Sequence, residues 1–173
     1  MAFTLYAATI PAYLQILGSM SGLIDKAEAH CRDQGLTADT LLGARLADDM
    51  HPFAYQVKST VVHSLGAIEG VRKGSFSPDT SPLPTDFDTL RDRVAGAVKA
   101  LQAIDPAEID GFIGRDMCFE FGSFRMDFTA EDFLLSFSQP NFYFHATTAY
   151  AILRMKGVEV GKRDFMGQTR RKP

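Results

Sequence analysis

The sequence has no tryptophan and only two cysteines, Cys31 and Cys118, which lie far apart along the chain. They form neither a C-x-x-C redox motif nor the dense cysteine framework of a small disulfide-stapled domain. Free thiols persist in reducing compartments, so we expect a cytoplasmic protein.

Several catalytic motifs are also missing. The sequence contains no G-x-S-x-G nucleophile elbow, no Walker-type phosphate loop and no H-E-x-x-H metalloprotease motif. No reaction and no catalytic residue can therefore be named from sequence motifs.

A general excess of basic charge is absent, since the net charge is −3. Nucleic-acid binding needs concentrated Lys and Arg, so we expect no nucleic-acid partner. A local excess occurs in residues 158–173, which we interpret as a solvated C-terminal tail.

A long uninterrupted apolar run is lacking as well. Residues 2–24 are apolar enough to resemble a signal segment, but Pro11, Gln15 and several Ser and Thr residues interrupt them, and no Lys or Arg precedes them. We expect an amphipathic first helix here, and no membrane partner.

What the sequence does contain is helical periodicity. Its 173 residues, 46% of them hydrophobic, suffice for one core, so we expect a single domain over residues 1–173. Apolar residues recur at spacings of three and four in four stretches, which predicts a mainly α protein with four long helices. The predicted helices begin or kink at Pro11 and end by Gly35, run from Pro52 to about Gly70–Gly74, from Thr85 to Ile104, and from Pro140 to Gly157. A further helical stretch over Phe133–Phe137 is predicted before the last helix, and Pro140 either separates the two or kinks one into the other.

Between the third and fourth helices the period changes from helical to alternating. Phenylalanines alternate with polar residues on both sides of Gly122-Ser123, which predicts a β-hairpin over Met117–Thr129. A two-stranded hairpin is marginal in water, so its aromatic face should pack on the bundle or on another subunit. Because this aromatic area exceeds what a ribbon can hide, we expect a homodimer.

The fourth helix carries the clearest candidate site. Asn141 and His145 fall on one face of an otherwise apolar helix, where neighbouring helices should pack. A buried imidazole needs a hydrogen-bond partner, and Gln56, Asn141 or a backbone carbonyl can supply it. We expect His63, seven residues after Gln56, at the inner or boundary face of the second helix.

Three segments resemble an uncharacterised bacterial family of the DinB-like superfamily: Asn141-Phe-Tyr-Phe-His-Ala-Thr-Thr-Ala-Tyr-Ala-Ile-Leu-Arg-Met-Lys-Gly157, Gly161-Lys-Arg-Asp-Phe-Met-Gly167 and His51-Pro-Phe-Ala-Tyr-Gln-Val57. The resemblance covers essentially the whole chain. It implies an up-down-down-up four-helix bundle, commonly dimeric, here with a small β-hairpin insertion before the last helix. It also implies a divalent metal held by three histidines, which some members use for thiol transfer.

This chain departs from that metal pattern. The superfamily's H-x-x-x-H pair in the fourth helix is Asn141-x-x-x-His145 here, and Gln56 stands about where the second-helix histidine is expected. Amides are poor zinc or nickel ligands compared with imidazole. We expect no metal, and His145 and His51 as ligands if one binds; no cofactor is assigned.

Two function classes remain open. In the first, His51, Gln56, Asn141 and His145 line a polar pocket between helices, a degenerate form of the superfamily's metal site, that binds a small molecule. With an intact metal site, this class extends to a metal-dependent hydrolase or thiol transferase. In the second, the bundle is a non-catalytic, dimeric interaction or structural protein.

Overall fold

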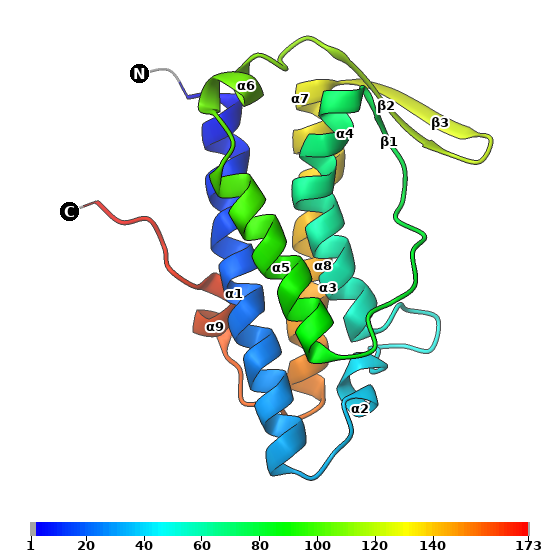
Figure 1. The fold of residues 1–173 in the computed structure, drawn as a ribbon, viewed down its shortest axis with the longest axis vertical. Helices are drawn as coiled ribbons and strands as arrows, with labels where there is room; N and C mark the ends of the chain where they lie inside the picture. The colour runs from blue at the N-terminus through cyan, green and yellow to red at the C-terminus, as the bar shows by residue number, and fades with distance from the viewer. Residues whose placement is uncertain (1–2, 173) are drawn as a thin grey trace.

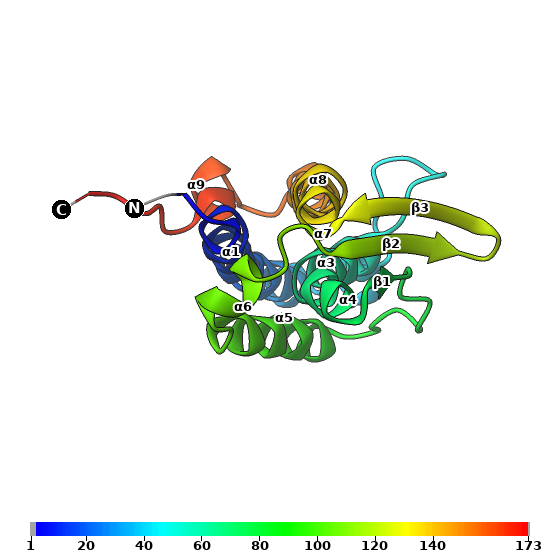
Figure 2. The ribbon, with the colours of Figure 1, turned by 90° about the horizontal axis from the view of Figure 1, so that it is seen from above.

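Four long helical segments lie side by side in the computed structural model, which describes residues 3–172 (Figure 1). The first and last run in one direction and the two middle ones in the other, so the predicted up-down-down-up order is confirmed. Seen from above, the four segments surround a common centre and the hairpin projects to one side (Figure 2). The elements are α1 (Leu5–Asp33), α2 (Asp39–Leu42), α3 (Phe53–Val61), η1 (Val62–Gly66), α4 (Ala67–Lys73), β1 (Ser75–Phe76), α5 (Phe87–Gln102), α6 (Pro106–Asp110), β2 (Asp116–Phe121), β3 (Phe124–Thr129), α7 (Ala130–Asp132), η2 (Phe133–Ser138), α8 (Gln139–Met155) and α9 (Lys162–Met166).

The first helix begins before Pro11. Thr4 caps α1, because its hydroxyl accepts a hydrogen bond from the N–H of Ala7 at 3.2 Å, and Pro11 lies inside the helix. By length and composition α1 could cross a membrane, but 50% of its apolar window is buried in the bundle, as in any core helix. Its buried side chains meet those of α5 and α8 in the core.

The second helix contains a turn that the sequence did not predict. α3, η1 and α4 are continuous from Phe53 to Lys73, and η1 is a π-helical turn between the two α-helical parts. Gly74 ends the helix with φ 79°, a left-handed conformation that glycine adopts without a Cβ penalty. The predicted end near Gly70–Gly74 is confirmed. π-Helical turns are rare and are frequent at functional sites.

The fourth helix is also continuous, from Ala130 to Met155, through α7, the π-helical segment η2 and α8. Of the two alternatives for Pro140, the one in which it separates the stretch Phe133–Phe137 from the last long helix is therefore wrong. Proline has no N–H to donate into the preceding turn. The missing bond falls directly after η2, where the regular α-helical pattern is already interrupted.

The hairpin is part of a three-stranded sheet. β2 and β3 are antiparallel, with Phe121 opposite Phe124, and the chain turns at Gly122-Ser123 as predicted. Gly122 has φ 59°, the conformation of the first central residue of a type II′ turn. The predicted hairpin gains a third strand that the sequence did not predict, because β1 pairs with β2 in parallel. β1 is too short for its residues to show alternation.

Part of the segment expected to be a solvated tail packs on α1. Val158 and Val160 are buried, and Lys26 Nζ of α1 lies 2.7 Å from a carboxylate oxygen of Asp164 in α9. The exposed tail begins after Gly167. The sequence pattern missed this docking because the two valines are short interruptions in a charged segment.

Candidate functional site

One hydrogen bond between the second and fourth helices forms the centre of the site. Nδ1 of His145 in α8 lies 2.7 Å from Oε1 of Gln56 in α3. At the other end of the amide, Gln56 Nε2 donates to the backbone carbonyl of His51 at 2.9 Å. A carbonyl can only accept, so the amide orientation is determined and His145 must donate from Nδ1. Nε2 of His145 therefore carries the ring's lone pair.

A similar arrangement joins the two π-helical turns. Ser138 Oγ of η2 donates to the backbone carbonyl of His63 in η1 at 3.1 Å, and lies 3.3 Å from His63 Nδ1. A hydroxyl has a single hydrogen, so Ser138 accepts from His63 Nδ1. His63 thus has the same tautomer as His145, with its lone pair on Nε2.

The two imidazole rings are neighbours. The ring centroids of His63 and His145 are 5.7 Å apart, and the ring planes differ by 15°. Neither Nε2 has a hydrogen-bond partner among residues 3–172, and in that part of the chain Tyr13 Oη is the single buried side-chain N or O atom without one. Both Nε2 atoms therefore reach solvent.

Aromatic rings surround this pair. His51 stacks on Tyr55 at a centroid distance of 3.8 Å, and Tyr55 meets His145 edge-on at 5.9 Å. Three phenylalanine rings complete the surroundings: the centroids of Phe76 and Phe137 lie 5.4 and 6.1 Å from that of His63, and the centroid of Phe144 lies 5.4 Å from that of His145. The site offers two nitrogen acceptors within an aromatic wall.

Burial keeps both imidazoles neutral. Desolvation, followed by the charge of neighbouring His145, lowers the pKa of His63 to about 3. Desolvation, followed by the charge of His51, lowers the pKa of His145 to about 4. At neutral pH both rings are uncharged hydrogen-bond acceptors.

Three of the four predicted site residues come together here. Gln56 and His145 are bonded to each other, and His51 contributes its backbone carbonyl while its ring, which is exposed, stacks beside them. The amide of Asn141 bonds within its own helix instead: its Nδ2 donates to the carbonyl of Phe137 at 2.7 Å.

Two further residues belong to the site although the sequence did not single them out for it. His63 was predicted only at the inner or boundary face of its helix; its seven-residue spacing from Gln56, close to two helical turns, was the available signal. Ser138 had no signal, because its position depends on the π-helical turn η2.

The donor set does not fit the three-histidine metal centre that the resemblance implies. Within residues 3–172, no three His, Cys, Asp or Glu side chains gather closely enough to hold an ion. The two amides that stand where histidines are expected are committed elsewhere: Gln56 Oε1 accepts from His145, and Asn141 bonds its own helix. The absence of metal stays a prediction that needs its own measurement.

Hollows also lie elsewhere on the molecule. One of about 780 Å³ runs between α1 and α9, along Gly18 and Gly22. Its lining shares no residue with the histidine pair. The pair is a partly exposed surface site between helices.

Comparisons with known proteins agree with this fold. Residues 5–166 match the model of a family described as a domain of unknown function (DUF1993). Among solved structures, the chain is similar to a crystal structure of a DinB family member protein from Shewanella denitrificans, with 28% sequence identity and a TM-score of 0.79. That match covers 98% of this chain and 95% of the other. The comparison with curated proteins found no match.

Proposed function

We propose that this chain, which belongs to the DUF1993 family, binds a hydrogen-bond-donating aromatic small molecule at His63 and His145. The supporting observation is the shared tautomer of the two rings. Gln56 and Ser138 each hold an Nδ1–H, so two adjacent rings each leave an Nε2 lone pair available. Apolar and aromatic surroundings with a few placed polar groups are characteristic of small-molecule sites.

The lowered pKa values favour binding over proton transfer. With a pKa of about 4, protonation of His145 at pH 7 is uphill by about three pH units, or ~4 kcal/mol. A general base works best with a pKa near the operating pH. The two rings are therefore suited to accept hydrogen bonds from a ligand, and we assign no reaction.

A matched pair of probes tests the proposal: phenol, which has an O–H donor, and anisole, in which a methyl group replaces that hydrogen. NMR spectra of the histidine rings should shift saturably with phenol and much less with anisole. The variant His145→Phe keeps an aromatic ring but lacks Nε2, so it should lose the phenol response. Equal shifts with both probes, or an unchanged response in His145→Phe, would contradict the proposal.

His30 supplies the control. It lies on α1, outside the cluster of rings around His63 and His145. The variant His30→Phe makes the same chemical change there, and it should leave the response to phenol intact.

A second function, that of a dimeric interaction protein, is favoured by the aromatic side chains at the tip of the hairpin. Phe121 and Phe124 are 57% and 56% exposed. Exposed aromatic side chains on a projecting element commonly mark an interaction site. This function does not exclude ligand binding at His63 and His145.

We also propose a cytoplasmic location. Cys31 and Cys118 are buried, and neither forms a disulfide bond. This use of cysteine is typical of proteins in reducing compartments. Localisation of a tagged full-length chain by cell fractionation tests it.

A further inference from the structure

The outer edge of the small sheet is open. Within residues 3–172 the strand order is β1-β2-β3, so in that part of the chain β3 has a neighbouring strand on one side only. Cys118 of β2 donates its N–H to the carbonyl of Gly74, on the β1 side, at 3.1 Å. In an antiparallel pair, opposed residues exchange both hydrogen bonds or neither. Asp127, opposite Cys118, therefore directs its N–H and C=O away from β2, and so does Arg125 two residues earlier.

These outward-facing groups can bond a second β3 strand in only a few registers. In each of them, residues that direct their N–H and C=O outward, such as Arg125, Asp127 and Thr129, must lie opposite outward-directed residues of the second copy. With the two-fold axis at Met126, Arg125 lies opposite Asp127 of the partner subunit, and the same pair repeats on the other side of the axis. With the axis at Arg125 or at Asp127, two like charges face each other instead. Like charges directly opposite are destabilising.

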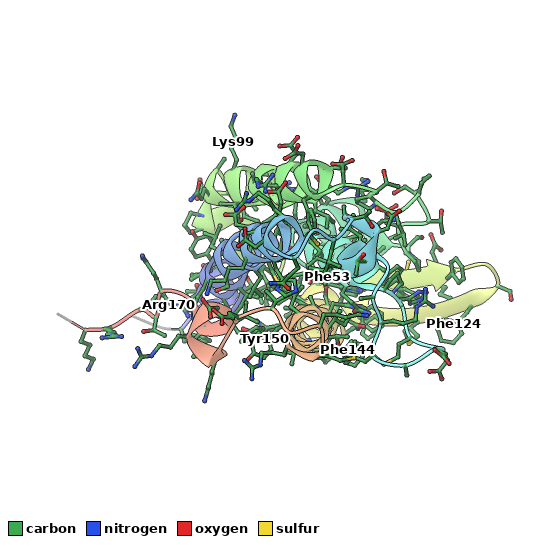
Figure 3. All side chains as sticks on the ribbon, turned by 90° about the horizontal axis from the view of Figure 1, so that it is seen from below. Phe53, Lys99, Phe124, Phe144, Tyr150 and Arg170 are labelled. Carbon is green, nitrogen blue, oxygen red and sulfur yellow. The ribbon has the colours of Figure 1, made fainter. Side chains whose placement is uncertain are left out.

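The apolar face of the sheet matches in the same register. Phe124 lies opposite Phe128 of the partner subunit, and the two copies of Met126 face each other. Phe124 is 56% exposed and lies on the projecting hairpin, away from the helices (Figure 3). Cross-strand aromatic pairs stabilise antiparallel sheets.

From this geometry we propose that two copies of the chain dimerise through their β3 strands, antiparallel and centred on Met126, to form one sheet across both subunits. Edge strands commonly carry Lys, Pro or a bulge that discourages pairing. β3 instead carries one charge of each sign. Within a subunit Arg125 already donates to the Asp127 carboxylate at 2.8 Å. In the dimer, the two pairs become a cluster of four alternating charges. This complementarity identifies a second copy of the chain as the occupant of the edge.

Charge reversal tests both the interface and its register. Light scattering and sedimentation at about 1 to 100 µM, a range that spans the affinities of small interfaces, should show a dimer for the unaltered chain. Asp127→Arg should lower the association constant at least about tenfold, because two arginines then face each other twice. Arg125→Asp should act likewise. The double variant, Arg125→Asp with Asp127→Arg, restores opposite charges and should dimerise again.

A mixture of the two single variants gives the most specific test of the register. Each single variant alone should associate at least about tenfold more weakly than the unaltered chain, while an equimolar mixture should form a heterodimer, since every facing pair is then of opposite sign. Lys99→Asp, an exposed charge reversal on α5, away from the hairpin, is the control and should dimerise normally (Figure 3).

Folding of each variant is checked by circular dichroism. Asp127→Arg is the cleaner single variant, because Arg125 keeps its contact with Glu120 at 3.6 Å. A monomeric unaltered chain at about 100 µM overturns the proposal. An association constant that is unchanged in both single variants also overturns the proposal. Failure of both the mixture and the double variant to associate overturns the register.

Discussion

Lowering the pH should destabilise this protein well before its carboxylates titrate. In the unfolded chain a histidine has its ordinary pKa of about 6.5. In the folded protein, burial lowers the pKa of His63 to about 3 and that of His145 to about 4. At pH values between the folded and the unfolded pKa, the unfolded state binds more protons than the folded state. The free energy of unfolding therefore falls as the pH falls from about 6.5. Above about pH 6.5 both histidines are neutral in either state, and their contribution to the free energy of unfolding is fully present.

The magnitude follows from proton linkage. Between pH 8 and pH 5, a histidine whose pKa falls from about 6.5 to about 4 loses about 2 kcal/mol of stabilisation, and the shift at His63 gives a similar figure. Both rings are partly exposed, so solvent screens part of the effect. We therefore expect about 2 kcal/mol from the two together, a large part of the 5–15 kcal/mol typical of a domain.

Urea denaturation followed by far-UV circular dichroism at several pH values from about 8 to 5 measures the loss. The double variant His63→Asn and His145→Asn keeps neutral donors for Ser138 and Gln56 but cannot titrate. Its stability should be nearly independent of pH in this window. Equal stability of the unaltered chain at both ends of the window, or NMR pKa values near 6.5 for both rings, would refute the reasoning.

Three further predictions concern single residues. Tyr13→Phe should stabilise the protein by about 1 kcal/mol, because it removes a fully buried hydroxyl that has no hydrogen-bond partner among residues 3–172; a loss of stability in urea would show that the hydroxyl is bonded. Lys58→Met should cost about 2–4 kcal/mol, since the buried ammonium donates to two carbonyls of the following loop at 2.9 and 2.6 Å. The exposed change Lys99→Met should stay within about 0.5 kcal/mol, and equal effects of the two would contradict the assigned role. Elemental analysis after mild chelation should find far less than about one zinc or nickel ion per chain, and Asn141→His should raise metal affinity by adding an imidazole beside His145; a stoichiometric metal in the unaltered chain would contradict the first part.

Part of the candidate site could be predicted from the sequence. His145 was identified because a polar side chain on an apolar helical face needs a partner, and Gln56 was among the partners expected. Helical spacing puts Asn141 one turn from His145, but it does not show that its amide bonds the carbonyl of Phe137. Spacing determines the face of a helix on which a side chain lies, but it does not determine which neighbour the side chain binds.

The sequence by itself determined the four helices and the hairpin turn, because periodicity, caps and glycines act over a few residues. The order of the helices in the bundle was implied by the family resemblance, not by these local patterns. Only the tertiary structure decided the rest. The π-helical turns that hold His63 and Ser138 form where two helices meet, and β1 is a strand only because β2 lies beside it. The neutral state of the two histidines likewise depends on burial by segments distant in sequence, and no local pattern encodes that burial.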